Sequence, residues 1–321
     1  MRRFSFFLGI LVSLALLFLL FFNINFSQFI AAFRKANYYY TFLIIILVFA
    51  GCYVRALRWR WLMMPIKEIS PGNLFMATII GYMGNALLPA RMGEFVRAHV
   101  IGRRAGISRA ASFATIIVER LFDGLSILIL LVMVLFLIKV PVQGALIAAG
   151  WLALLLYSLV IIIILMFNFK REMVLKLFGF VFNFLAVATK QKIIRMLGSL
   201  ADGFKVVGTG RYLPIIIFYS FLIWIITALG VYLVVLSFGY NISYGAAVFI
   251  LVLLSFVVMI PSAPGFLGTL DAGMAYGLML FAVPREAALS IAVFYHGLSF
   301  LPIVILGCYY LWRYNLSLSA E

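Results

Sequence analysis

Charged side chains are scarce in this sequence, and carboxylates are the scarcest of them. Only 11% of the 321 residues are charged, with 9 Asp and Glu against 25 Lys and Arg. A soluble globular domain carries about 25% charged residues. This chain is instead 67% hydrophobic, with a mean hydropathy of +1.21. The composition therefore excludes a soluble globular protein and predicts an integral membrane protein.

Residues that build common catalytic and metal centres are also few. The only two cysteines, Cys52 and Cys308, both lie in predicted membrane spans, which indicates packing rather than a disulfide framework or a metal site. No Walker motif, zinc-ligand spacing or nucleophile elbow occurs, which argues against ATP-driven pumping and hydrolysis. An enzyme that acts on a lipid-linked sugar would need carboxylates in its first external loop. The loop Asn23–Asn37 contains none. We therefore expect no cofactor, no metal and no enzymatic activity.

Long apolar runs make up most of the chain. A bilayer core about 30 Å thick needs about 20 apolar residues per crossing helix. Seven runs predict such helices: Phe4–Phe22, Tyr38–Leu57, Ala111–Ile138, Ala145–Phe167, Tyr212–Phe238, Tyr244–Ile260 and Ala287–Trp312. Two further runs, Gly72–Leu88 and Gly265–Val283, are interrupted by Gly and Pro and predict broken or re-entrant helices. The expected fold is an all-α integral membrane protein with seven to eight transmembrane helices and two broken ones, in a single polytopic domain over residues 1–321.

The basic residues predict the orientation of the chain. Lys and Arg accumulate in the cytoplasmic loops of membrane proteins. With a cytoplasmic N-terminus, 19 of the 25 lie on that side, and only Arg34, Lys35 and Lys139 lie outside. The net charge of +16 is therefore explained by the basic residues on the cytoplasmic side of the membrane. No motif supports nucleic-acid binding.

Eight of these basic residues lie between Lys170 and Arg211, among several phenylalanines. We interpret residues 170–211 as a basic cytoplasmic connector between two halves of the protein. It is either an ordinary basic loop or an amphipathic helix that contacts anionic inner-leaflet lipids.

Several charged residues fall at membrane depth. The 15 apolar residues from Gly124 to Ile138 span only about 22 Å, so the helix must include the preceding Asp123 and Arg120, with Glu119 at its edge. Arg120 and Asp123 share a helix face, and the remaining acid needs a cation from another helix. Arg91 and Arg97 are the candidate partners. The group is either a structural ion pair or a substrate site.

A second acid, Asp271, lies alone in the run Gly265–Val283. An isolated carboxylate at this depth also predicts a functional site. His296, in the last span beside Tyr295, would either relay a proton or form a structural hydrogen bond.

The two interrupted segments share a pattern: an apolar run, a Pro, a Gly four residues later, and a carboxylate. The residues that define these predicted breaks are Pro89, Gly93, Pro261, Pro264, Gly265 and Gly268. Paired breaks in two halves of a chain point to a transporter's binding site. A helix that starts after such a break also presents free N–H groups to an anion. The alternative is an ordinary pair of kinks.

Four motifs together resemble the lysylphosphatidylglycerol synthase transmembrane family of flippase-like membrane proteins. They are Arg55-x-x-Arg58-Trp59, Asn85-x-x-Leu88-Pro89-Ala90-Arg91-x-Gly93-Glu94-x-x-Arg97, Glu119-Arg120-x-x-Asp123 and Pro261-x-x-Pro264-Gly265-x-x-Gly268-x-x-Asp271. The resemblance implies a multi-pass protein of the prokaryotic cytoplasmic membrane that moves lipids between leaflets. It also implies a possible glycosyltransferase or lipid-synthesis partner. The last motif departs from the family pattern, with Asp271 where Glu is usual and Leu270 where a polar residue is frequent.

These observations favour a lipid flippase that moves a phospholipid, glycolipid or isoprenoid lipid with a polar headgroup. The alternatives are a membrane-embedded lipid-modifying transferase and a scaffold for a glycosyltransferase. Arg91 and Arg97 would hold an anionic headgroup, and the acids would balance or exchange charge in one shared cavity. The predicted substrate-binding residues are Asn85, Arg91, Glu94, Arg97, Glu119, Arg120, Asp123 and Asp271.

Overall fold

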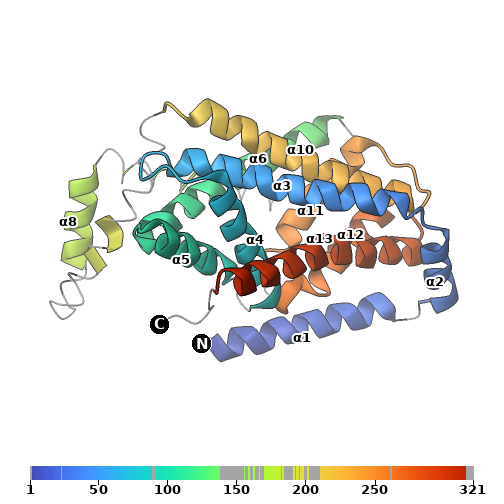
Figure 1. Ribbon diagram of the computed structural model, residues 1–321. Coiled ribbons are helices and arrows are strands. Elements are labelled where there is room, and N and C mark those ends of the chain that lie inside the picture. Colours follow the sequence, from blue (N-terminus) through green and yellow to red (C-terminus); the bar gives the residue numbers. More distant parts are fainter. Residues whose placement is uncertain are drawn as a thin grey trace.

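The computed structural model describes residues 2–22, 24–88, 92–137, 170–181, 210–260 and 262–315, with scattered positions between 155 and 201. These residues contain helices and no strand, which confirms the predicted all-α class. The elements, drawn in Figure 1, are α1 (Arg2–Phe21), α2 (Phe26–Lys35), α3 (Tyr39–Met63), α4 (Pro71–Leu87), α5 (Gly93–Ala105), α6 (Arg109–Leu137), α8 (Arg171–Val181), α10 (Leu213–Ser237), α11 (Tyr244–Val257), the 3-10 helix η3 (Pro264–Phe266), α12 (Thr269–Met279) and α13 (Arg285–Arg313).

Three described helices, α3, α10 and α13, are long and apolar enough to cross a membrane, fewer than the seven predicted. A fourth span forms if α1 and α2, which are bent by 88° relative to each other, count as one broken helix. Part of the shortfall lies in α11, which has 14 residues and extends about 21 Å, too short to cross the core alone. The predicted span Ala145–Phe167 lies outside the described residues except at isolated positions.

The two predicted interrupted segments each form a short helix next to a break. Gly72–Leu88 corresponds to α4, and Gly265–Val283 contains η3 and then α12. With 11 residues, α12 extends about 17 Å, which is half the thickness of the bilayer core. The segment Gly265–Val283 therefore has no helix that spans the membrane by itself.

The two halves of the chain repeat one order of helices. In the first half α3, α4, α5 and α6 have 25, 17, 13 and 29 residues. In the second half α10, α11, α12 and α13 have 25, 14, 11 and 29 residues. Each half is thus a long helix, two short helices around a break, and a second long helix. The first break lies between the end of α4 at Leu87 and the start of α5 at Gly93, and the second lies between the end of α11 at Val257 and the start of α12 at Thr269.

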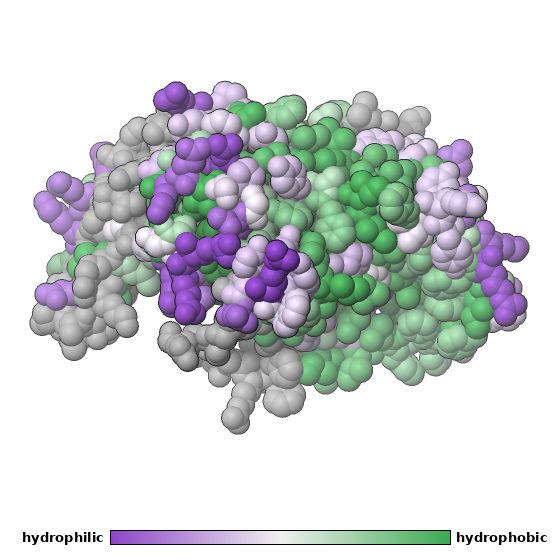
Figure 2. Space-filling view, in the orientation of Figure 1, coloured by the Kyte–Doolittle hydropathy of each residue, from purple (hydrophilic) through white to green (hydrophobic). Residues whose placement is uncertain are grey.

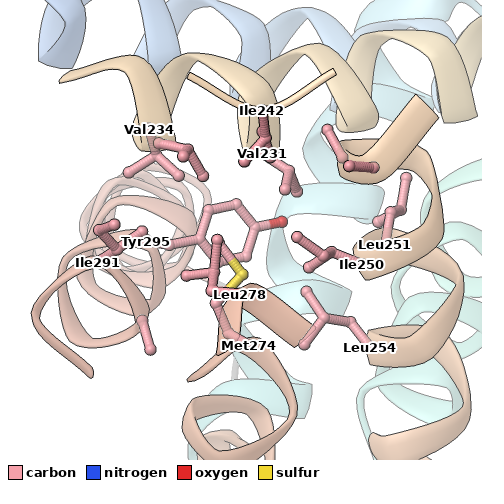
Figure 3. Close-up of a cluster of buried hydrophobic side chains, with 14 of the residues drawn as sticks. Val231, Val234, Ile242, Ile250, Leu251, Leu254, Met274, Leu278, Ile291 and Tyr295 are labelled. Carbon is pink, nitrogen blue, oxygen red and sulfur yellow. The ribbon is translucent and has the colours of Figure 1, made fainter. Parts of the chain in front are cut away.

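Each half packs around its own apolar core. The first core joins α3 to α6 through side chains such as Trp59, Ile80 and Ile116. The second joins α10 to α13, and Figure 3 shows the ring of Tyr295 in its middle among aliphatic side chains such as Leu278. Because α3 packs along α10 and α4 packs against α13, the halves are joined along their length.

The surface has the character expected of a protein that faces lipid. Figure 2 shows a broad apolar region in the body of the molecule, with hydrophilic residues gathered toward its two ends. Large apolar side chains are exposed on the spanning helices, among them Phe42, Ile225 and Ile305. An exposed apolar surface of this kind is stable in hydrocarbon and not in water.

The predicted connector is described mainly by α8, at the left of Figure 1. Val174 is buried against the first core, whereas Met173 and Phe180 are exposed. The contact of residues 170–211 with anionic lipids stays a prediction.

Candidate functional site

A cluster of arginines and carboxylates lies buried where α3, α5 and α6 meet. Its centre is Glu119, which is fully buried and accepts two hydrogen bonds from Arg97, at 2.7 Å to Oε1 and 3.0 Å to Oε2. The guanidinium of Arg97 also stacks on the ring of Trp59, with 3.7 Å from Cζ to the ring centroid. Arg97 is therefore the cation from another helix that the sequence required for the remaining acid.

Asp123, one turn further along α6, is held by two arginines of α3. Arg58 Nη1 donates to Asp123 Oδ1 at 2.6 Å and to the hydroxyl of Ser220 on α10 at 3.0 Å. Arg55 Nη1 lies 3.5 Å from Asp123 Oδ2, the longest contact that this carboxylate makes. Arg55, Arg58 and Arg97 are among the 19 basic residues that the charge distribution assigns to the cytoplasmic side. The structure places all three on helices, inside this cluster.

Arg120 completes the cluster, which we call the Arg–carboxylate cluster. Its guanidinium contacts Asp123 at 3.2 Å, Glu119 at 3.3 Å and Glu94 of α5 at 3.1 Å. The four arginines in the cluster thus face three carboxylates. Among the described residues, the cluster carries one net positive charge.

A pocket of about 150 Å³ opens beside this cluster, between α3, α10 and α13. Its walls are mainly aliphatic, and Arg55 is the only charged residue that lines it. The Arg55 Cζ lies 5.9 Å from the ring centroid of Tyr82 and 5.7 Å from that of Trp224. Tyr295 and Ser299 of α13 line the opposite wall. We call this space the α3–α10–α13 pocket.

The first break is closed by close packing of α5 on α4. The side-chain oxygen of Asn85 accepts the N–H of Gly93 at 2.9 Å, at the first residue of α5. A Cβ at Gly93 would overlap the carbonyl oxygen of Gly81 and lie 2.6 Å from the backbone nitrogen of Asn85. Asn85 and Gly93 therefore join the two helices, whereas Pro89 and Arg91 lie outside the described residues.

The second break contacts both α1 and α4. The Ala263 N–H donates to Ser13 of α1 at 2.8 Å, and Gly268, at φ +79°, is so close to Ser13 that a Cβ would lie 2.8 Å from its carbonyl oxygen. Gly265, at φ +74°, lies against the backbone oxygen of Ala86 in α4. The second break therefore lies against the last turn of α4, the helix that precedes the first break. Pro264 begins η3, and Pro261 lies outside the described residues.

Asp271 forms a separate buried contact with His296, which we call the Asp271–His296 pair. His296 Nδ1 lies 2.9 Å from Asp271 Oδ1, and His296 Nε2 lies 2.8 Å from the carbonyl oxygen of Gly265. The second oxygen of Asp271 accepts the N–H of Gly268 at 2.9 Å. This pair joins α12, α13 and the second break.

The structure does not gather the predicted acids around one cavity. Glu94, Glu119 and Asp123 belong to the Arg–carboxylate cluster, and Asp271 binds His296 instead. The N–H groups predicted to be free for an anion are also occupied at Gly93 and Gly268, by side chains of the protein itself. The α3–α10–α13 pocket is lined by Arg55 of the Arg–carboxylate cluster and by Tyr295, the neighbour of His296 in the sequence, but not by Asp271 or His296.

The two halves carry equivalent acid–base contacts. Glu94, in the first turn of α5, contacts Arg120, the twelfth residue of α6. Asp271, in the first turn of α12, contacts His296, the twelfth residue of α13. In each half the short helix after the break is thus joined to the following long helix by one carboxylate and one basic side chain.

Sequence reasoning had not assigned two of these groups to the site. Arg55 and Arg58 lie at the end of an apolar run, where basic residues usually indicate the cytoplasmic side of the membrane. Their three-residue spacing, which puts both on one helix face, is the feature that indicates a shared site. For His296 the sequence leaves two roles open, proton relay and a structural hydrogen bond.

Comparison with known sequences shows which family has this arrangement. The family model described as the lysylphosphatidylglycerol synthase TM region matches residues 6–307. The chain belongs to this family. The match includes both breaks, the Arg–carboxylate cluster and the Asp271–His296 pair, and so it covers every described feature of the candidate site.

Individual relatives of this lysylphosphatidylglycerol synthase TM family member are archaeal membrane proteins. A UPF0104 membrane protein of Methanothermobacter thermautotrophicus is 26% identical over 96% of this chain and 92% of its own length. One from Methanocaldococcus jannaschii is 26% identical over 70% of this chain and 90% of its own length. A glycosyltransferase, AglD, of Haloferax volcanii is 37% identical over 75 residues, which cover 23% of this chain and 12% of AglD. No solved structure matches the chain significantly.

Proposed function

We propose that this protein is a lipid translocator that moves lipids with an anionic headgroup between the leaflets of a prokaryotic cytoplasmic membrane. The headgroup passes along the α3–α10–α13 pocket while the hydrocarbon chains remain in the bilayer. The protein does not modify the lipid, and its N-terminus faces the cytoplasm. Its membership of a family named for a lipid synthase supports a lipid as the substrate.

The observation that carries this proposal is the position of the surplus positive charge. Arg58, Arg97 and Arg120 each contact a carboxylate at 3.2 Å or less, whereas Arg55 lies 3.5 Å from its partner and also lines the pocket. A charge at membrane depth is costly without a counter-ion. A phosphate in the pocket would supply that counter-ion and accept paired hydrogen bonds from the guanidinium.

The surroundings of Arg55 fit a lipid headgroup better than a simple ion. The ring of Trp224 packs beside Arg55, with 5.7 Å from Cζ to the ring centroid. Thr227 and Ser299 add hydroxyls to walls that are otherwise aliphatic, such as Ile44 and Ile303. A polar headgroup with an attached hydrocarbon chain matches both kinds of lining.

The repeated helix order indicates how the two halves of the protein could move relative to each other. We propose that the halves are inverted repeats, as in transporters whose broken helices meet at a central site. The contact between Ala86 of α4 and Gly265 of the second break would open when one half rocks against the other. Broken backbone at this depth is tolerated where it lines a cavity, which such rocking would open.

The test is leaflet exchange in proteoliposomes, with fluorescent phosphatidylglycerol as the anionic lipid and fluorescent phosphatidylcholine for comparison. We expect the wild-type protein to exchange the anionic lipid faster. Arg55→Gln should lower that rate by about tenfold, the equivalent of one charge-assisted hydrogen bond. Arg313→Gln, which removes an exposed arginine at the end of α13, is the matched control and should not change it. Covalent change of the lipid would support the transferase alternative, and neither exchange nor product would support a scaffold.

The short match to AglD favours one further detail, a glycosyltransferase as a functional partner. In that case the translocated lipid is the carrier of a sugar. Competition of a polyprenyl phosphate with fluorescent phosphatidylglycerol in the same assay would support this detail. No competition at a large excess would argue against it.

A further inference from the structure

The hydrogen bonds of His296 require an additional proton. Its two ring nitrogens each contact an oxygen, Asp271 Oδ1 at 2.9 Å and the Gly265 carbonyl at 2.8 Å. A carbonyl oxygen only accepts, so Nε2 must carry a hydrogen. An ionised carboxylate also only accepts, so the second contact needs a hydrogen on Nδ1 or on Asp271 itself. The pair therefore holds one proton more than a neutral imidazole and a carboxylate.

The surroundings of Asp271 favour this proton on the histidine. The second carboxylate oxygen accepts the N–H of Gly268 at 2.9 Å, and the acid lies in the first turn of α12. Both a backbone donor and the positive end of a helix stabilise an ionised carboxylate. His296 is then an imidazolium that donates to Asp271 and to Gly265 at once.

Loss of that proton breaks one of the two contacts. A neutral imidazole keeps one N–H, which can serve Asp271 or the Gly265 carbonyl but not both. The oxygen left over then faces a nitrogen lone pair in a buried site, which is unfavourable. Because Gly265 is in the second break and lies against Ala86 of α4, the contact at risk holds the second break in its position beside α4.

The equivalent contact in the first half cannot respond in this way. There the base is Arg120, which stays charged at all accessible pH values, and its contact with Glu94 is 3.1 Å. The two halves thus have one permanent and one titratable acid–base contact at the same place. The two contacts occupy corresponding helix positions, and they differ in the chemical nature of the basic side chain.

We propose that the Asp271–His296 pair is a proton-binding site, and that release of its proton frees the second break from α13. When the proton is bound, the pair holds η3 against α4 and α13. When it is released, η3 can move away from Ala86 and the α3–α10–α13 pocket can open between the halves. The coupling of this step to lipid passage rests on the proposed function; the proton site itself does not.

Other ionisable groups on the packed elements do not replace His296. The arginines of α3 bond to Asp123 or Glu68, and Arg285 of α13 donates to backbone oxygens at the end of α1. Arg34 and Lys35 of α2 and Arg313 of α13 are exposed at helix ends, and Glu286 lies in the first turn of α13. The described side chains of α1 and η3 include no ionisable group, and α4, α10, α11 and α12 otherwise offer only the phenols Tyr82, Tyr219, Tyr232, Tyr244 and Tyr276, which are neutral near neutral pH.

The first experiment reads the proton directly and does not depend on transport. The chain has two histidines, so His99→Gln leaves His296 as the only signal in protein labelled with 15N-histidine. We expect both ring nitrogens to carry a hydrogen in most molecules, because each nitrogen contacts an oxygen that accepts. Asp271→Asn in the same background should lower that fraction, because the carboxylate is lost. A neutral ring with a bare Nε2 in both proteins would overturn the proton site.

The second experiment tests the coupling, with fluorescent phosphatidylglycerol in phosphatidylcholine vesicles. Between about pH 5.5 and pH 8, the range in which histidine titrates, the exchange rate of the wild type and of His99→Gln should rise several-fold. His296→Arg converts the pair into the permanent contact of the first half and should remove this rise. An unchanged pH profile in His296→Arg would overturn the coupling. No exchange by the wild type at any pH would instead contradict the proposed function, and the nuclear magnetic resonance result would still decide the proton site.

Discussion

At the scale of single residues, buried charge dominates this protein. Arg58, Arg97 and Glu119 are each fully buried, and each is compensated by partners from another helix. A buried ion pair contributes little net stability by itself, but removal of one partner is costly because the other charge remains in a medium of low dielectric. The same logic makes Arg55, the cation with the longest contact, the residue best placed to exchange its partner for a ligand.

The first prediction concerns Arg97. Arg97→Met should destabilise the protein by about 3 kcal/mol, because Glu119 would keep only the longer contacts with Arg58 and Arg120. Thermal unfolding in detergent micelles measures this effect. The double variant Arg97→Met/Glu119→Leu should be more stable than the single variant, since no unpaired acid remains.

A matched control for this prediction is the exposed pair of Arg60 and Glu68. Glu68→Gln should change stability by about 0–1 kcal/mol, as is usual for surface pairs. If Arg97→Met were no more destabilising than Glu68→Gln, Glu119 would have to be solvated, contrary to its complete burial.

At the scale of elements, close helix packing fixes both breaks. In α4 and α5, Gly81, Gly84 and Gly93 let the two backbones approach closely, as small residues do in membrane proteins. In the second break, the positive φ angles of Gly265 and Gly268 let the chain turn between α11 and α12. Glycine therefore permits close helix packing at the first break and positive φ angles at the second.

The second prediction follows from this packing. Gly93→Ala should prevent α5 from packing on α4, because the added methyl group would occupy the space of the Gly81 carbonyl. We expect loss of the monodisperse protein on size-exclusion chromatography in detergent. Gly72→Ala, in the first turn of α4, meets no atom within 4 Å and should leave stability unchanged or raise it by up to about 1 kcal/mol. Equal behaviour of the two variants would contradict the described packing.

At the scale of the whole molecule, the fold is two similar four-helix halves joined along α3 and α10. The charged groups divide between these halves, with arginines in the first and a histidine in the second. This division gives each break its own acid–base contact while the pocket lies where the halves meet. A movement of one half relative to the other would therefore change the pocket, whereas each acid–base contact lies within a single half.

The third prediction concerns the orientation of this molecule in the membrane. In a variant without Cys52 and Cys308, Lys35→Cys should react with a membrane-impermeant maleimide added outside intact cells, because the predicted span Phe4–Phe22 leads from a cytoplasmic N-terminus to an external α2. Lys67→Cys, exposed beyond the other end of α3, should react only after the membrane is opened. The opposite result would place the N-terminus outside. Reaction of both from one side would mean that α3 does not cross the membrane.

The sequence by itself determined the all-α membrane class, the family, the two breaks and the acids at membrane depth, because hydropathy, Pro and Gly positions and charge are properties of local sequence. It also named Arg97 as a partner for the acids of α6. The number of spans did not follow from it, since an apolar run such as Tyr244–Ile260 can also form a short buried helix.

Only the tertiary structure decided which charges meet. The pairing of Arg58 with Asp123, the contact of His296 with Asp271 and the opening of the pocket at Arg55 join residues that are 25 or more positions apart. Such contacts depend on how helices rotate and pack against one another, which no local pattern encodes. For the same physical reason, the charged residues predicted to share one cavity form two separate groups, of which only the Arg–carboxylate cluster contributes a residue to the pocket.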